Sequence, residues 1–94
     1  MKILKFRETH NISGERIRDL RKHRGLTQEQ VAAQMQVAGI QVDQKAISRI
    51  ESGLRIITDY ELLQLAKILK ISVDELFRES VYTAHTAEDD EERK

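Results

Sequence analysis

Cysteine and proline are both absent from this chain of 94 residues, and aromatic residues make up only 4% of it. Without cysteine, neither a disulfide nor a thiolate metal site can stabilise the fold. The sequence is therefore compatible with a reducing compartment. No apolar run approaches the roughly 18 residues that a membrane-spanning helix needs, and the start of the chain lacks the apolar stretch of a signal peptide. We therefore expect a soluble protein without a membrane partner, retained in the cytoplasm.

Length and charge narrow the class of protein further. A chain of 94 residues forms one small domain and has no room for a second core. The net charge of zero hides an asymmetry, because residues 1–60 hold 11 Lys or Arg against 7 Asp or Glu, while residues 61–94 hold 5 against 9. A basic first part followed by an acidic part suggests a nucleic-acid partner for the first.

Helix caps divide the chain into five predicted helices, and no segment alternates well enough to be a strand. Ser or Thr followed three residues later by Glu or Gln is a capping box, and Asp is a favoured N-cap. Gly25 ends the first predicted helix, and Gly53 stands where a left-handed residue ends the third. The fold class expected is all-α, and the residues predicted to cap its helices are Ser13, Thr27, Asp43, Thr58 and Ser72.

The predicted domain covers residues 12–79. Residues 1–11 precede it as an N-terminal arm, whose apolar side chains would pack either on the domain or on a partner. Residues 80–94 lose the helical period and contain five consecutive acids, Glu88 to Glu92, so an acidic, disordered tail is expected there.

The helix predicted over residues 44–52 carries the functional hypothesis. At about 100° per residue, its polar side chains fall on one face, while Ala46, Ile47 and Ile50 fall on the opposite side. We expect the isoleucines to anchor the helix in the core. The projecting face consists of Gln44, Lys45, Ser48, Arg49 and Ser52.

These side chains suit the recognition of DNA bases. Gln can form two hydrogen bonds with the N6 and N7 atoms of adenine, and Lys or Arg can bond the O6 and N7 acceptors of guanine. A helix of this size is about as long as the major groove is wide, near 12 Å. The alternative for the same face is an ordinary solvated helix surface.

The segments LTQEQVAAQM, ISRIESGLR and TDYELLQLAKILKISVDELF together resemble the phage-repressor and Cro-like helix-turn-helix family of transcriptional regulators, over about Ile12 to Phe77. The resemblance implies a lambda-repressor-like bundle of five helices whose third helix enters the major groove of an operator, as a homodimer. No cofactor is predicted. One departure is the link between the second and third helices, which at Gln36 to Val42 is longer than usual.

The resemblance also implies roles for individual residues. Gln44, Lys45, Ser48 and Arg49 would contact bases. Gln28 and Arg55 would contact phosphates, and we assign Ser52 to the phosphates as well. Arg21 and Glu51 would form a structural ion pair, for which the alternative is two unrelated surface charges.

Other functions remain as alternatives. The polar face could dock an acidic partner protein, as an antitoxin docks its toxin. No enzyme is predicted, because the chain has no Gly-rich phosphate loop and no nucleophile-elbow pattern. No metal site is predicted either, since His10, His23 and His85 are isolated from one another.

Overall fold

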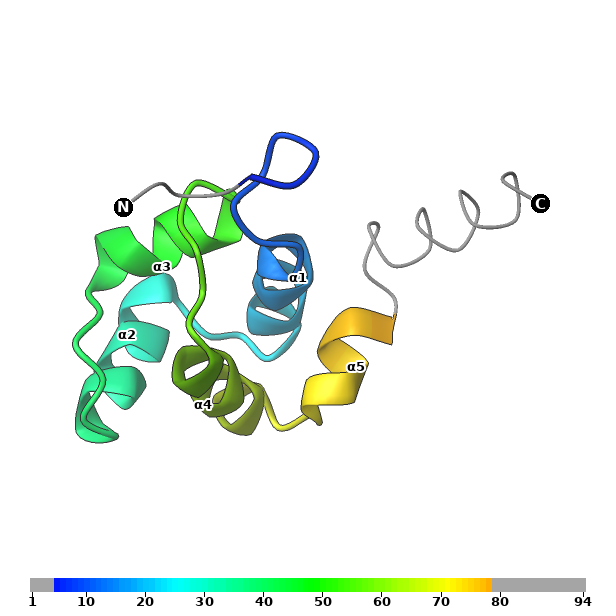
Figure 1. Cartoon of the computed structure of the whole chain (residues 1–94). Helices are drawn as coiled ribbons and strands as arrows, with labels where there is room; N and C mark the ends of the chain where they lie inside the picture. Colours follow the sequence, from blue (N-terminus) through cyan, green and yellow to red (C-terminus); the bar gives the residue numbers. More distant parts are fainter. Residues whose placement is uncertain (1–4, 79–94) are drawn as a thin grey trace.

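The computed structural model describes residues 5–78, so residues 1–4 of the expected arm and the whole of the expected acidic tail lie outside the described residues. Five helices form the described part, and its only β-type pairing is an isolated bridge between Phe6 and Thr9. The all-α prediction is confirmed. The helices, shown in Figure 1, are α1 (Gly14–His23), α2 (Gln28–Val37), α3 (Gln44–Glu51), α4 (Asp59–Leu69) and α5 (Val73–Arg78).

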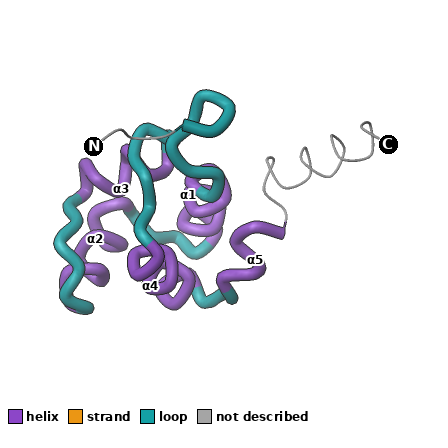
Figure 2. The backbone as a smooth tube through the Cα atoms, viewed as in Figure 1, coloured by secondary structure: helices purple, strands orange, loops and turns teal. Residues whose placement is uncertain are grey.

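The core lies where the apolar sides of all five helices meet. Figure 2 shows the helices crossing one another around it rather than running parallel. Ile47 and Ile50 of α3 are completely buried in it, as are Met35 of α2 and Leu65 of α4. Burying one such side chain contributes about 1.5–3 kcal/mol. The two isoleucines therefore fix which side of α3 faces outward.

Most helix starts follow the predicted caps. Thr27 and Thr58 form complete capping boxes, and the Asp43 carboxylate accepts a hydrogen bond from the Ala46 N–H at 2.8 Å. Ser13 lies at the N-cap position of α1, as predicted, but its side chain makes no cap hydrogen bond. The side chain of Asn11 accepts from the Gly14 N–H instead, at 2.7 Å.

The connection from α2 to α3 is long, as the sequence predicted, and it is held in place along its length. Gly39 follows α2 with a φ of +87°, a conformation that costs glycine little. Val42 is only 3% exposed and joins the core. The side-chain amide of Gln36 donates to the Val42 carbonyl at 2.7 Å. The chain therefore enters α3 from a fixed point rather than from a loose loop.

None of the helices in the described range is long and apolar enough to cross a membrane.

Candidate nucleic-acid interface

The outer face of α3 presents polar side chains to solvent. Gln44, Lys45 and Arg49 are exposed, and Ser48 is half-buried. Ser52, the residue that follows the helix, is exposed and its hydroxyl donates to the Ser48 carbonyl at 3.0 Å. The five residues of the predicted polar face therefore lie on the side opposite the buried isoleucines, and a ligand can reach them.

The N-terminal half of this face is tied to α2 by a chain of side-chain hydrogen bonds. Gln44 Nε2 donates to Gln28 Oε1 at 2.6 Å, and Gln28 Nε2 donates to Glu51 Oε1 at 3.0 Å. Because a carboxylate only accepts hydrogen bonds, Glu51 fixes the Gln28 amide with its oxygen turned toward Gln44. The structure thus joins two residues that the sequence analysis assigned to separate tasks.

This series of side-chain hydrogen bonds ends at an ion pair between α1 and α3. Arg21 Nε donates to Glu51 Oε2 at 2.6 Å, and Arg21 Nη2 donates to Glu51 Oε1 at 3.0 Å. Both residues are buried, and Arg21 Nη1 also donates to the Leu26 carbonyl at 2.8 Å. The pair therefore connects α1, the start of α2 and the last turn of α3.

The N-termini of α2 and α3 differ as sites for an anion. At α3, the negatively charged Asp43 caps the helix and weakens the attraction of its N-terminus for phosphate. At α2 the cap is the neutral Thr27, whose capping box uses the N–H groups of Thr27 and Gln30. The start of α2 is consequently the better place for a phosphate oxygen.

Arg55, which follows α3, forms an ion pair that the sequence did not predict. Its two terminal nitrogens donate to the two carboxylate oxygens of Glu61, at 2.9 and 3.0 Å. Burial disfavours the charged form of Glu61, but hydrogen bonds from Arg55 and from the Thr58 N–H outweigh it and hold the pKa of Glu61 below its usual value. The hydrogen bond with Glu61 likewise raises the pKa of Arg55.

The order and packing of these helices can be compared with known proteins. A family model described as helix-turn-helix matches residues 17–76, which extends from α1 to α5 and includes α2 and α3 entirely. The chain belongs to the Cro/C1-type helix-turn-helix family. No curated protein matches the chain. As a Cro/C1-type helix-turn-helix protein, it is a DNA-binding protein of transcription regulation.

In this Cro/C1-type protein, residues 9–11, which precede α1, form a brace that holds the end of α3. Asn11 Nδ2 donates to the Ile50 carbonyl at 3.0 Å and to the Arg55 carbonyl at 2.8 Å. The His10 N–H donates to the Gly53 carbonyl at 2.8 Å. Thr9 is also buried, so this segment, which belongs to the predicted N-terminal arm, packs against the helices.

Sequence reasoning missed this brace for a physical reason. Asn11 is a good capping residue, but Ser13 is one as well, and nothing local distinguishes them. The close packing of α1 against α3 determines which of the two side chains caps α1. A Cβ atom on Gly14 would collide with the Ile50 carbonyl oxygen, so α1 begins directly against the end of α3, where Asn11 can bridge the two.

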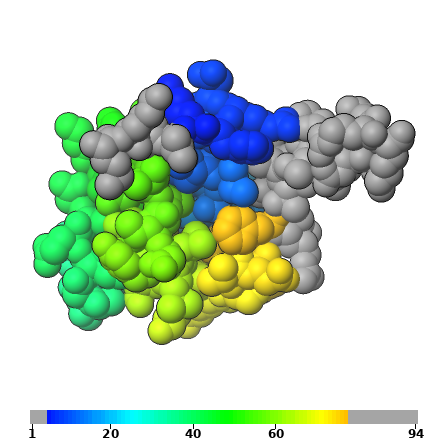
Figure 3. Space-filling model, viewed as in Figure 1, coloured from blue at the N-terminus to red at the C-terminus, as the bar shows by residue number. Residues whose placement is uncertain are grey.

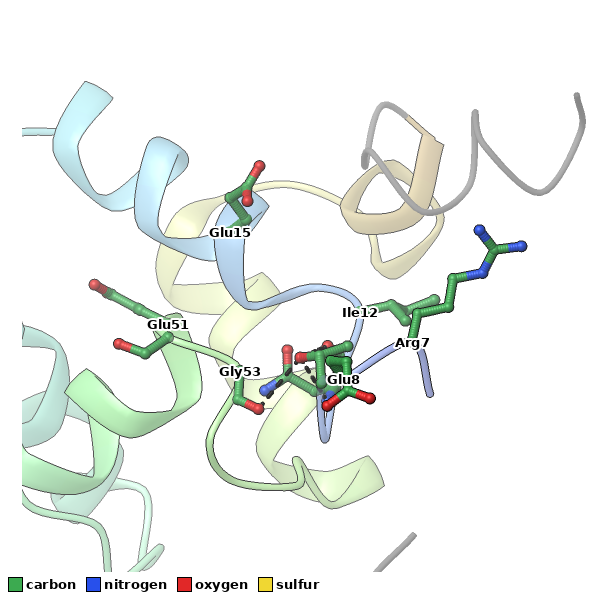
Figure 4. Close-up of a pocket in the computed structure, with 9 residues that line it drawn as sticks. Arg7, Glu8, Ile12, Glu15, Glu51 and Gly53 are labelled. Atoms are coloured by element: carbon green, nitrogen blue, oxygen red, sulfur yellow. Dashed lines mark hydrogen bonds between the residues drawn. The ribbon is translucent and has the colours of Figure 1, made fainter. Parts of the chain in front are cut away.

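The brace leaves a small cavity of about 190 Å³ beside the end of α3. Figure 4 shows Glu8, Ile12 and Gly53 around it, with Arg7 extending away from Glu15 and Glu51. Among residues 5–78, no group of His, Cys, Asp and Glu side chains could hold a metal ion. Despite its acidic lining, the cavity gives no metal site.

Proposed function

We propose that this protein binds double-stranded DNA in a sequence-specific manner with α3 in the major groove. The observation that carries the proposal is the exposure of Gln44, Lys45 and Arg49 over a helix anchored by buried isoleucines. With eight residues, α3 is about 12 Å long, close to the width of the groove.

The base contacts follow from the donors and acceptors of each side chain. Gln44 gives one of its two amide hydrogens to Gln28. Its other amide hydrogen and its oxygen remain for the N7 and N6 atoms of an adenine. Lys45 and Arg49 suit the O6 and N7 acceptors of guanine, and Ser48 can donate to several base edges.

Phosphate contacts are proposed for the residues at both ends of this face. Gln28 donates one amide hydrogen to Glu51, which leaves the second for a phosphate oxygen near the start of α2. Ser52 and Arg55 lie at the other end of α3. Arg55 is half-buried, and with both terminal nitrogens on Glu61 its remaining N–H groups would have to serve the phosphate.

We further propose that the protein is a repressor that occupies an operator as a homodimer. One α3 covers only a few base pairs, and two copies related by a two-fold axis would read two half-sites one helical turn apart. The Arg21–Glu51 pair would hold α3 against α1 when the groove is engaged. No chemistry on the DNA and no cofactor are part of this function.

The test is to select bound sequences from a random pool of double-stranded DNA with the full chain. Enrichment of a palindrome is expected, because a two-fold dimer reads two inverted half-sites. Arg49→Ala should lose the preference at one position of each half-site. A pool that shows no enriched sequence, at a salt concentration where the protein does bind DNA, would contradict sequence-specific readout.

The alternative is a protein-interaction module whose α3 face docks an acidic protein partner, as in an antitoxin. Lys45 and Arg49 would suit such a partner as well as they suit DNA. The paired amides of Gln28 and Gln44 favour DNA, because they add no charge attraction toward an acidic protein and match the edge of an adenine.

A further inference from the structure

Exposed apolar side chains concentrate in one short stretch of the chain. Of the six large apolar side chains that are exposed in residues 5–78, four lie within residues 54–63. Figure 3 shows the segment from α3 to α4, in light green, on the surface of the molecule. Single exposed apolar residues are ordinary, but four of them within ten residues indicate a surface that contacts a partner. They are Leu54, Ile56, Tyr60 and Leu63, which are 55, 45, 60 and 50% exposed.

The outward side of α4 extends this surface with polar residues. Its side chains follow a helical stripe opposite the buried Leu65 and Leu69. We call this stripe the α4 face. It consists of Asp59, Tyr60, Leu63, Gln64 and Lys67.

The charges of the α4 face are arranged symmetrically. Asp59 lies four residues before Leu63, and Lys67 lies four residues after it, which is about 6 Å in each direction along the helix. Both charged side chains are exposed, and neither forms a salt bridge within the described residues. One acid and one base at equal distances from a central leucine make the stripe complementary to itself when it is turned by 180°.

We propose that the α4 face, together with Leu54 and Ile56, is the contact between two copies of this chain. The two α4 helices pack antiparallel about a two-fold axis at Leu63, with Asp59 of each copy opposite Lys67 of the other. A two-fold contact uses the same patch on both subunits, and this patch supplies both members of its own ion pairs. A uniformly acidic or basic partner would meet a like charge at one end.

This inference rests on the proposed function, since it names the surface that makes the proposed homodimer. The interface takes one helix face and one loop from each copy, and contacts of that size are typical of weak, reversible association. Binding of two half-sites on one DNA molecule would then strengthen the dimer by effective concentration.

The experiment measures self-association of the full chain without DNA by sedimentation equilibrium. Asp59→Lys and Lys67→Glu each place two like-charge pairs across the axis, so each variant alone should raise the dimer dissociation constant about tenfold. In an equimolar mixture, a heterodimer of the two variants again has two opposite-charge pairs. The mixture should therefore associate about as well as the unmodified chain. If the mixture stays as weak as its components, the antiparallel arrangement is wrong.

Leu63→Lys tests the centre of the interface, and Val37→Lys is its matched control. Val37 is 90% exposed on α2 and lies outside the proposed surface. Leu63→Lys should raise the dissociation constant at least about tenfold, because two lysines then meet at the axis. Val37→Lys should leave it unchanged. Equal constants for Leu63→Lys and the unmodified chain, or a chain that is monomeric at every soluble concentration, would overturn the proposal.

Failure of this inference can be told apart from failure of the proposed function. Binding to a DNA fragment that carries one half-site uses α3 alone, so Leu63→Lys should retain it. If the unmodified chain did not bind the half-site fragment but still self-associated, the DNA function would be rejected and the proposed interface would stand.

Discussion

The proposed function depends on the residues that hold α3 in place as well as on the residues of its exposed face. Glu51 is the acceptor for both Arg21 and Gln28, and its side chain is only 2% exposed. Removing one member of a buried ion pair leaves the other charge without compensation, which costs about 3–5 kcal/mol. The position of α3 therefore depends on a residue that contacts no DNA in the proposed complex.

Glu51→Ala should lower the free energy of unfolding by about 3–5 kcal/mol, because it strands the Arg21 guanidinium in the core. Urea unfolding followed by circular dichroism measures this change. In the double variant Arg21→Ala/Glu51→Ala neither charge of the pair is left, so its loss should be smaller than the sum of the two single losses. Additive losses would mean that the pair contributes nothing as a pair.

Gln44→Ala should weaken binding to the selected operator by about 1–3 kcal/mol and relax the preference at one base pair. The structure adds a consequence for Gln28, whose oxygen holds the Gln44 amide. Gln28→Ala should weaken binding to all sequences and also relax the preference at the Gln44 base pair. Competition assays with operators changed at single positions measure both effects.

Arg49→Ala is the control for this effect. It should relax the preference at a different base pair and leave the preference at the Gln44 base pair unchanged. If Gln28→Ala weakened every sequence by the same factor, the hydrogen bond to Gln44 would have no part in base recognition.

Glu61 should make the fold sensitive to acid. Its pKa lies below the ordinary 4.5, so the unfolded chain binds the proton more tightly than the folded chain. The ion pair with Arg55 therefore stabilises the fold fully above about pH 4.5, and this contribution is lost as pH falls through the lowered folded pKa. Urea unfolding at pH values from about 6 down to about 3 measures it. Glu61→Gln should flatten the dependence, whereas Glu29→Gln, at an exposed glutamate of α2, should keep it.

At the scale of helices, local sequence signals were enough to place the elements. Capping boxes at Thr27 and Thr58 depend on residues three positions apart, so they can be recognised from the chain alone. The same holds for Asp43 before α3 and for the apolar side of that helix. The side-chain cap of α1 by Asn11 was not predicted, because Asn11 is held by the carbonyl of Ile50, which lies 39 residues further along the chain.

The brace before α1 can be tested with two glycines that share a backbone conformation. Gly53 and Gly25 have φ values of +76° and +71°, so replacing either with alanine incurs a similar backbone penalty, about 1–2 kcal/mol. A Cβ atom on Gly25 meets nothing, whereas one on Gly53 would collide with the Thr9 hydroxyl. Gly53→Ala should therefore lose more stability than Gly25→Ala in thermal unfolding.

Gly53→Ala should also weaken operator binding, because displacement of the brace releases the end of α3. Thr9→Ala relieves the collision, so the variant Gly53→Ala/Thr9→Ala should recover part of the difference. Equal effects of the two glycine replacements would show that the brace does not hold α3.

Across the whole molecule, the sequence predicted which residues face outward but not how they connect. The wheel of residues 44–52 separates polar from apolar side chains because helical geometry is local. The link from Gln44 to Gln28 joins residues 16 positions apart, and the link from Thr9 to Gly53 joins residues 44 apart. Such contacts depend on how helices pack, and spacing in one sequence does not encode that. The pairing of Arg55 with Glu61 was missed because it depends on the path of the loop between α3 and α4.

The distribution of charge over the molecule yields the last prediction, the dependence of affinity on salt. Residues 1–60, which contain the proposed DNA-binding face, hold 11 basic residues against 7 acidic ones. With about six phosphate contacts per complex, a plot of log affinity against log salt should have a slope near −5. Random-sequence DNA should give a similar slope at lower affinity, because phosphate contacts are independent of sequence. Titrations between about 50 and 200 mM salt measure both slopes. An acidic protein partner releases few condensed counterions, so a shallow slope with DNA and tight binding to such a protein would favour the interaction module instead.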